Sequence, residues 1–142
     1  MKLDLTKEQY RELVGAMFLS DLVRHSMKNS PEEHSETFIE AEQALYSQHD
    51  QFDETERIEK DEESGVYLPT LALESEQMTY LRDYEQAILT DQIAAVLARN
   101  AWEKEVQSGA VTEEAAVNRL IELEDHFHVL LEEKGLSALN IK

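Results

Sequence analysis

The sequence predicts an all-α fold. Apolar side chains recur at steps of three and four residues, helix-capping patterns precede these stretches, and the 142 residues include only 4 Gly and 2 Pro. Sandwiches and barrels need a turn every few residues, which so few glycines and prolines do not supply. A chain of this length can build one real core. We therefore expect residues 1–142 to form a single domain, a bundle of about four main helices over residues 7–28, 31–50, 76–107 and 112–134.

Capping patterns define the first two helices. Thr6 and Gln9 have the spacing of a capping box, as do Ser30 and Glu33, with Pro31 at the first helical position of the second helix. The apolar face of the first helix is expected to hold Tyr10, Leu13, Val14, Met17, Phe18 and Leu22. That of the second is expected to hold Phe38, Ala41, Leu45 and Phe52, flanked by Ile39 and Tyr46. The short link between them predicts an antiparallel helical hairpin.

An acidic stretch follows the second helix. Residues 50–63 read DQFDETERIEKDEE, and Ser64-Gly65 interrupts them. Residues 66–69 are apolar, but Pro69 forbids a helix interior and favours an extended Leu68. We expect an irregular connection between the second and third helices, with the side chains of 66–69 covering the core.

Helical periodicity returns near Met78, and Asp83 with Gln86 offers another capping pattern, so the third helix has two candidate starts. Its wide stripe predicts the most central helix, and we expect it to end at Ser108-Gly109. The stripe comprises Ile88, Leu89, Ile93, Val96, Leu97, Ala101, Trp102 and Val106. Thr112 is expected to cap the fourth helix, with Glu113 and Glu114 in its first turn, and Lys134-Gly135 to close it. The fourth helix is expected to bury Val117, Leu120, Ile121, Phe127, Leu130 and Leu131.

The charge excludes some classes of function. With 31 acidic and 13 basic residues, the net charge is −18. Such a polyanion repels phosphate backbones, so we expect no nucleic-acid binding. Solvated helix faces account for this charge, and a DNA mimic or a binder of basic partners is the sharper alternative.

The remaining composition bears on location. The N-terminal residues carry an acid where a signal peptide is apolar, and the longest apolar run is too short to cross a bilayer. There is no Cys, which excludes disulfides and thiolate chemistry and fits a reducing compartment. We expect a cytoplasmic protein that does not bind membranes.

One carboxylate cluster resembles a known metal site. Glu32, Glu33 and Glu36 match the Glu-Glu-x-x-Glu pattern with which all-helical nucleotide pyrophosphohydrolases hold Mg²⁺ near phosphates. Those families add Glu-x-x-Asp on the next helix, whereas here the pairs Asp53/Glu56 and Glu56/Glu59 follow. The alternative is that the three glutamates are first-turn residues of the second helix, favoured by its dipole.

The fourth helix concentrates further potential ligands: Glu122, Glu124, Asp125, His126 and His128. Glu122 with His126, and Glu124 with His128, share a face at i, i+4. One helix offers too few ligands for a metal site, and none of the five histidines has Glu three residues before it, as a ferritin-like di-metal centre requires. A solvated face beside a buried Phe127 is the favoured interpretation.

Other catalytic sets are missing from the sequence. It contains no Gly-rich phosphate loop, nucleophile elbow or dinucleotide motif. We assign no catalytic, cofactor-binding or metal-ligating residue, and no cofactor. Core packing is the favoured role of Trp102 and of the five tyrosines, with an aromatic ligand groove or protein interface as the alternative.

Three short segments carry a resemblance. Residues 5–10 (LTKEQY), 65–70 (GVYLPT) and 97–102 (LARNAW) resemble segments of a group of small acidic bacterial proteins without an assigned function. The resemblance spans most of the chain and implies a bacterial, cytoplasmic protein. It carries no functional residue to this sequence.

These observations predict a non-enzymatic protein-interaction module. Its partner is an unidentified protein or a second copy of the chain, since small helical proteins often bury a leftover apolar stripe in a two-fold dimer. The alternative is a divalent-metal-dependent phosphohydrolase that uses Glu32, Glu33 and Glu36.

Overall fold

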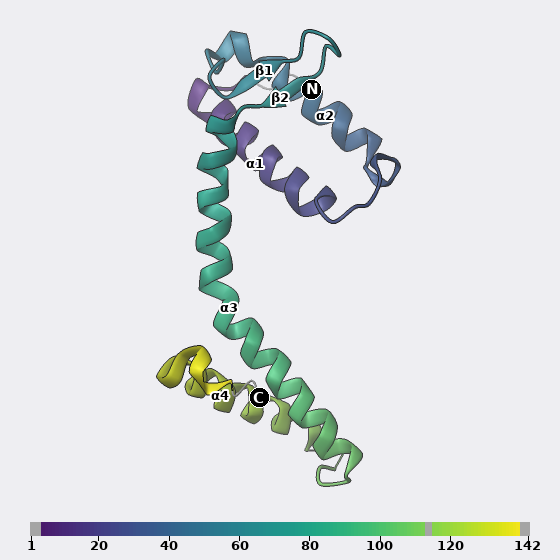
Figure 1. Cartoon of the computed structure of the whole chain (residues 1–142), viewed down its shortest axis with the longest axis vertical. Helices are drawn as coiled ribbons and strands as arrows, with labels where there is room; N and C mark the ends of the chain where they lie inside the picture. The colour runs from purple at the N-terminus through teal and green to yellow at the C-terminus, as the bar shows by residue number, and fades with distance from the viewer. Residues whose placement is uncertain (1–3, 113–114, 140–142) are drawn as a thin grey trace. The chain divides into compact units, whose positions relative to one another are not determined.

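The computed structural model describes residues 4–112 and 115–139 (Figure 1). Within these residues the α-helices are α1 (Lys7–His25), α2 (Glu36–Tyr46), α3 (Leu71–Gln107) and α4 (Ala116–Lys134). Shorter 3₁₀ turns are η1 (Pro31–Glu33), η2 (His49–Phe52) and η3 (Gly135–Ala138), and the strands are β1 (Ile58–Lys60) and β2 (Tyr67–Pro69). The expectation of a mainly all-α fold with four helices is confirmed. None of the described helices is long and apolar enough to cross a membrane.

Two compact units make up the chain. The first unit is Met1–Arg82 and the second is Asp83–Lys142, so α3 contributes residues to both. A division of the chain by its internal contacts does not show whether the two units unfold together or separately. The single domain expected over residues 1–142 therefore stays a prediction.

The start of α1 is as expected. The Thr6 hydroxyl accepts a hydrogen bond from the Gln9 backbone N–H at 3.2 Å, and the Gln9 side chain accepts one from the Thr6 N–H at 3.0 Å. This confirms the capping box. The helix ends at His25 rather than at residue 28. Residues 26–28 are exposed, so continuing the helix would add nothing to the core.

The predicted start of α2 is wrong. Pro31–Glu33 form the separate turn η1, where the Ser30 side chain makes no capping hydrogen bond. His34 is extended, and Ser35 then caps α2 by accepting a hydrogen bond from the Phe38 N–H at 3.3 Å. Ser30 precedes η1 and Ser35 precedes α2, but only Ser35 makes a capping hydrogen bond. The helix also ends before residue 50, at Tyr46, and η2 follows it.

The expected antiparallel pairing of the first two helices is confirmed by contacts at both ends. Near the start of α1, the Tyr10 hydroxyl donates to the Leu45 carbonyl at 2.8 Å. At the end of α1, the His25 ring meets the Phe38 ring edge-on, with centroids 5.2 Å apart. The start of α1 thus contacts the end of α2, and the end of α1 contacts the start of α2.

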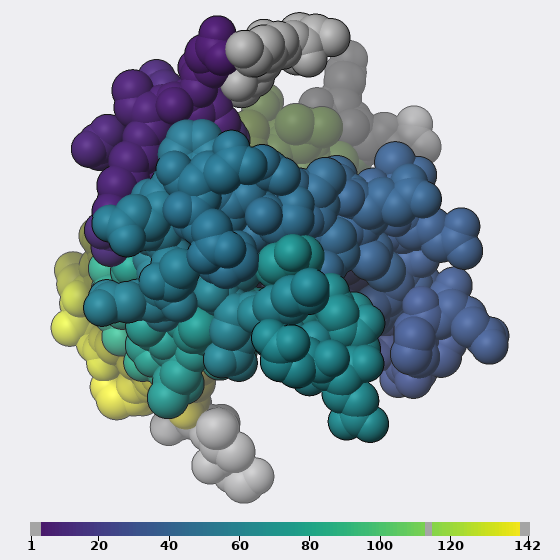
Figure 2. Space-filling view, turned by 90° about the horizontal axis from the view of Figure 1, so that it is seen from above, coloured from purple at the N-terminus to yellow at the C-terminus, as the bar shows by residue number. Residues whose placement is uncertain are grey.

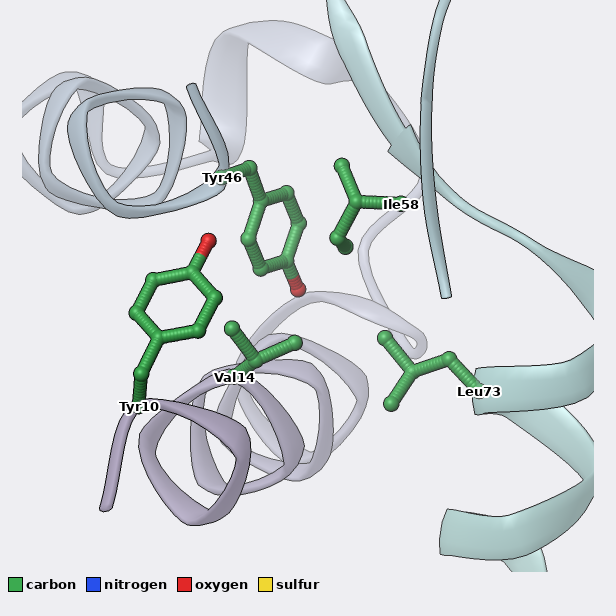
Figure 3. Packing of buried hydrophobic residues seen from close by; sticks show 5 residues of the cluster. All are labelled: Tyr10, Val14, Tyr46, Ile58 and Leu73. Atoms are coloured by element: carbon green, nitrogen blue, oxygen red, sulfur yellow. The ribbon is translucent and has the colours of Figure 1, made fainter. Parts of the chain in front are cut away.

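The core of the first unit joins helices to the strands (Figure 3). Its fully buried members are Tyr10 and Val14 from α1, Tyr46 from α2, Ile58 from β1 and Leu73 from α3. Tyr10 also stacks on Phe52 at a centroid distance of 4.2 Å. Four segments that are distant in sequence therefore share one apolar cluster, and its burial is the main stabilising contribution in this unit.

The connection between α2 and α3 is a β-hairpin, which corrects the expected irregular segment. Strands β1 and β2 are antiparallel, with Ile58 opposite Pro69 and Lys60 opposite Tyr67. The Asp61 carboxylate accepts hydrogen bonds from the turn amides, and Gly65 takes a positive φ of 72°. The acidic segment lies on the face of the molecule seen in Figure 2.

A side chain of α2 determines where the hairpin lies. The Gln43 amide donates to the Tyr67 carbonyl and accepts from the Tyr67 N–H, both at 2.8 Å. Tyr67 is half-buried against the core, as expected for this segment, whereas Val66 and Leu68 are exposed. Because this pairing depends on a glutamine 24 residues away, local pattern alone does not show it.

Helix α3 starts at Leu71, five residues earlier than expected. Its first two turns belong to the first unit and bury only Leu73 and Gln77. Gly15 of α1 allows this approach, since a Cβ there would lie 2.6 Å from the Gln77 amide nitrogen. The apolar residues of these turns, Leu71, Ala72 and Leu73, are consecutive and show no helical spacing, so their pattern is too weak to predict a helix.

In the second unit, small residues replace the expected wide apolar stripe. Ala94 and Ala98 of α3 are fully buried, together with Leu123 and Leu131 of α4. All the residues of the expected α3 stripe are half-buried or exposed, and the expected buried residues Val117 and Ile121 of α4 are exposed. Alanines on α3 leave room for the side chains of α4, which a stripe of large residues would fill.

The structure contradicts the predicted cap of α4 and confirms its predicted end. The N-cap position is Ala115, without a side-chain cap, so the expected cap at Thr112 is wrong. The expected first-turn residues Glu113 and Glu114 lie outside the described residues. At the other end Gly135 follows Lys134 with a positive φ of 57°, which confirms the predicted helix end.

Candidate functional site

The structure divides the Glu-Glu-x-x-Glu cluster between two elements. Glu32 and Glu33 belong to η1, whereas Glu36 is the first residue of α2, after an extended His34. The prediction that all three belong to the first turn of one helix is wrong. Among the described residues, no three His, Asp or Glu side chains are placed to hold a metal ion together. The phosphohydrolase alternative thus has no geometric observation in its favour, and it stays a prediction.

On α4, the expected i, i+4 pairs are not the contacts formed. Glu122 pairs with Arg119, with Oε2 and Nη1 3.0 Å apart. His128 pairs with Asp91 of α3 and with Glu132, whose Oε1 lies 3.5 Å from its Nδ1. Glu124, Asp125 and His126 are exposed, as expected for a solvated face, and Phe127 is only half-buried.

The aromatic residues fall into two groups. Tyr10 and Tyr46 are fully buried, and Trp102 is half-buried with its Nε1–H donating to the Ala116 carbonyl at 2.8 Å. These confirm the core role. Tyr80 and Tyr84 are largely exposed, so the core role is wrong for them.

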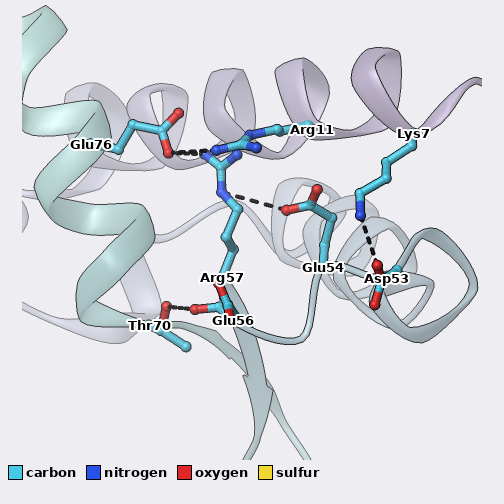
Figure 4. Close-up of polar contacts among 8 residues, drawn as sticks. All are labelled: Lys7, Arg11, Asp53, Glu54, Glu56, Arg57, Thr70 and Glu76. Carbon is cyan, nitrogen blue, oxygen red and sulfur yellow. Dashed lines mark hydrogen bonds and ion pairs between the residues drawn. The ribbon is translucent and has the colours of Figure 1, made fainter.

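A cluster that the sequence did not predict surrounds Arg57 (Figure 4). Arg57 and Glu54 are each only 5% exposed, although both lie in the acidic stretch expected to belong to an irregular connection. The Arg57 Nε lies 3.7 Å from Glu54 Oε2, and its Nη2 lies 2.8 Å from Glu76 Oε2 of α3. Arg11 of α1 approaches the same Glu76 oxygen at 3.4 Å. The one usable signal was an arginine followed by isoleucine within a run of acids.

A second buried polar group joins α1 to α2. The His25 ring is buried, with Nδ1 2.7 Å from the Asp21 carboxylate, and its Nε2 accepts from the Ser35 N–H at 3.3 Å. The His34 ring stacks on it at 4.5 Å. Both ring nitrogens thus bond within the protein. This arrangement orients the helices and leaves neither nitrogen for a substrate.

Nearby on α2, burial and the charge of Asp21 raise the pKa of Glu42 above its ordinary value. A raised carboxyl pKa means that the folded state binds a proton more readily than the unfolded state, so ionised Glu42 opposes folding at neutral pH. Glu42→Gln is expected to raise the free energy of unfolding at pH 7 by on the order of 0.5 kcal/mol.

The gain should shrink as the pH falls through the folded-state pKa and vanish below the unfolded one. Urea denaturation at several pH values measures it. The exposed Glu40→Gln on the same helix is the matched control for the loss of one charge. A gain of equal size in both variants would assign it to the net charge of −18 rather than to burial.

The second unit carries an apolar groove along α3. Leu89, Ile93, Val96 and Leu97, here called the α3 strip, line a groove of about 250 Å³ together with Gln92 and Leu139. Leu89 is 46% exposed and Val96 is 60% exposed. Ile93 and Leu97 are half-buried, next to Ala94 and Ala98, which are fully buried. Helical spacing at i, i+4, i+7 and i+8 puts its four members on one side of α3.

Charged and amide side chains flank the strip at a spacing of seven residues. Glu85, Gln92 and Arg99 follow one another along the same edge of α3, and all are exposed. Among the described residues, the lining of the groove is aliphatic apart from Gln92 and includes no nucleophilic side chain. The arrangement suits contact with another apolar helix face rather than chemistry.

Comparison with known proteins gives no relative: no family model, no curated protein and no solved structure matches this chain.

Proposed function

We propose that the protein is a non-enzymatic interaction module that pairs with a second copy of itself through the α3 strip. The observation that carries this proposal is the exposure of Leu89 and Val96 on a strip whose four members are all aliphatic. A helix face of this kind is stabilised when another apolar face covers it. We also propose a cytoplasmic location, because a chain without cysteine needs no disulfides and so fits a reducing compartment.

The edge of the strip favours a second copy as the occupant. In an antiparallel pair, residues at corresponding edge positions of the two helices face each other. A two-fold axis near Gln92 would set Glu85 of each copy against Arg99 of the other, and Gln92 against Gln92. The apolar strip therefore has an edge whose charges, Glu85 and Arg99, are complementary to those of a second copy. A net charge of −18 otherwise repels a second copy, so this local match supports pairing at the strip.

Sedimentation velocity across the micromolar range at fixed ionic strength tests the proposal. The full chain is expected to show a concentration-dependent dimer that Val96→Glu abolishes, because that change buries an unpaired carboxylate in the contact. Val117→Glu is the matched control, since Val117 is equally accessible on α4 and lies outside the groove. A wild-type chain that stays monomeric at every concentration would overturn self-association.

Charge reversal tests the antiparallel arrangement separately. Glu85→Arg and Arg99→Glu alone each put like charges together at two symmetric contacts, so each should raise the dimer Kd by about tenfold. The double variant restores opposite charges and should return the Kd to the wild-type value. If the double variant is weaker than either single variant, the two-fold pairing is wrong.

A further inference from the structure

A polar cavity in the first unit carries an inference independent of self-association. Its volume is about 370 Å³, and it is lined by the start of α1, the 53–57 segment before β1 and the first turns of α3. Three of the chain's 13 basic residues line it: Lys7, Arg11 and Arg57. Four acidic residues line it as well, Asp53, Glu54, Glu56 and Glu76, so cations are concentrated here relative to the rest of the chain but do not outnumber the carboxylates.

The guanidinium of Arg57 is buried with free donors. Its Nε, Nη1 and Nη2 are each fully buried and have no hydrogen-bond partner among the described residues. The contact with Glu76 is an ion pair that lacks the alignment of a hydrogen bond, and the contact with Glu54 is longer, at 3.7 Å. Buried polar groups in folded proteins are almost always hydrogen-bonded, so donors of this kind need an acceptor.

The planar fork of an arginine is best matched by two oxygens in one plane. A carboxylate supplies them and can accept two parallel N–H hydrogen bonds. Figure 4 shows the side chains of Arg11 and Glu76 next to the guanidinium of Arg57. Lys7, at the start of α1, pairs with Asp53. That pair joins the Lys7 Nζ and an Asp53 oxygen at 2.9 Å and is largely exposed.

The charges around the cavity disfavour a dianion more strongly than a monoanion. Arg57 and Arg11 pair with Glu54 and Glu76, and Lys7 pairs with Asp53, whereas the exposed Glu56 adds a fourth carboxylate to the lining. A monoanion then meets a lining with one excess negative charge, beside the free donors of Arg57. A phosphate dianion would meet two carboxylates already beside Arg57, which repel it more strongly.

We infer that the cavity is a binding site for a small carboxylate, held by the guanidinium of Arg57, with Arg11 and Lys7 at its rim. The ligand's oxygens accept from the buried nitrogens of Arg57, and the volume is that of a small-molecule site. Arg57 is the specificity-determining residue, because its buried, unpartnered fork can donate to both oxygens at once.

Amide NMR titration of the full chain with sodium acetate tests the inference, with sodium chloride and inorganic phosphate as comparators at the same ionic strength. Acetate is expected to cause saturable shifts confined to residues that line the cavity, with the Arg57 Nε–H signal moving most. Phosphate and chloride are expected to cause only small, non-saturating shifts. Equal responses to all three anions, or no saturable response to acetate, would overturn the assignment.

Variants distinguish a ligand site from a purely structural ion cluster. Arg57→Lys keeps the charge beside Glu54 and Glu76 but loses the fork, so the acetate Kd should rise by about tenfold or more while the chain still folds. Arg24→Lys, a second arginine of the first unit that lies outside the cavity, is the matched control and should leave the Kd unchanged. If Arg57→Lys binds acetate as the wild type does, Arg57 serves packing alone and the inference is wrong. Monomeric and dimeric chains should titrate alike, since the cavity and the α3 strip share no residue.

Discussion

Tyr10→Ala is expected to lower the free energy of unfolding by about 3–5 kcal/mol, as large-to-small changes at buried aromatic residues do. Tyr10 is fully buried and stacks on Phe52, so its removal opens a cavity between α1, α2 and η2. It also removes the hydrogen bond from the phenol to the Leu45 carbonyl. Burial raises the pKa of Tyr10 to about 12, so the phenol remains protonated and donates this bond throughout the neutral range.

Urea denaturation followed by far-ultraviolet circular dichroism measures the loss. Tyr10→Phe separates its two parts, since it keeps the ring and removes the hydroxyl, and should cost about 1 kcal/mol. Tyr80→Ala is the matched control, because that tyrosine is largely exposed in the same unit. A Tyr10→Ala loss no larger than that of Tyr80→Ala would contradict the core described for the first unit.

The same experiment tests the expectation of a single domain. Trp102 is the only tryptophan and belongs to the second unit. If residues 1–142 unfold as one domain, Tyr10→Ala moves the Trp102 fluorescence transition together with the circular dichroism transition. A Trp102 transition that stays in place would show that the second unit unfolds separately.

Arg57→Met is expected to cost about 3–5 kcal/mol, the range for breaking a buried ion pair by removing one partner. Glu54 is 5% exposed, and Arg57 is the cation beside it. Without that cation, the Glu54 carboxylate stays buried and uncompensated. The Glu76 carboxylate contributes less to this destabilisation, because it also contacts Arg11 and is more exposed.

The double variant Arg57→Met/Glu54→Gln should recover a large part of this loss, since it removes the buried charge along with its partner. Thermal and urea unfolding of the two variants measure the recovery. Arg82→Met, at an exposed position of α3, is the control for losing a positive charge from an acidic chain. A double variant as unstable as Arg57→Met alone would show that the arginine stem's packing, not its charge, stabilises the cluster.

Local capping chemistry made some boundaries predictable. The Thr6–Gln9 capping box starts α1 at the expected residue, because both hydrogen bonds join residues three apart. At the start of α2, two serines compete, and only Ser35 has a helical Phe38 three residues on to cap. The same local rule therefore predicts α1 correctly and places the start of α2 five residues too early.

The β-hairpin and the Arg57 cluster were not predictable in this way. Their partners are far apart in sequence: Gln43 bonds Tyr67, and Arg57 contacts Glu76. An acidic stretch that appears solvated also buries Glu54 and Ile58. Composition describes the average of such a segment, whereas burial depends on which residue the fold turns inward.

The sequence by itself determined the helical class, the capped start of α1, and the antiparallel pairing of α1 with α2, since these depend on periodicity and on residues close in the chain. Only the tertiary structure decided that β1 and β2 pair, that alanines rather than large side chains of α3 pack against α4, and that Arg57 lies buried beside a cavity. The α3 strip shows both contributions: helical spacing aligns its four residues, but only the packing of the unit decides that Leu89 and Val96 are exposed while Ile93 and Leu97 are half-buried. Local hydrogen bonds depend on neighbours in the chain, whereas burial and ion pairing depend on neighbours in space.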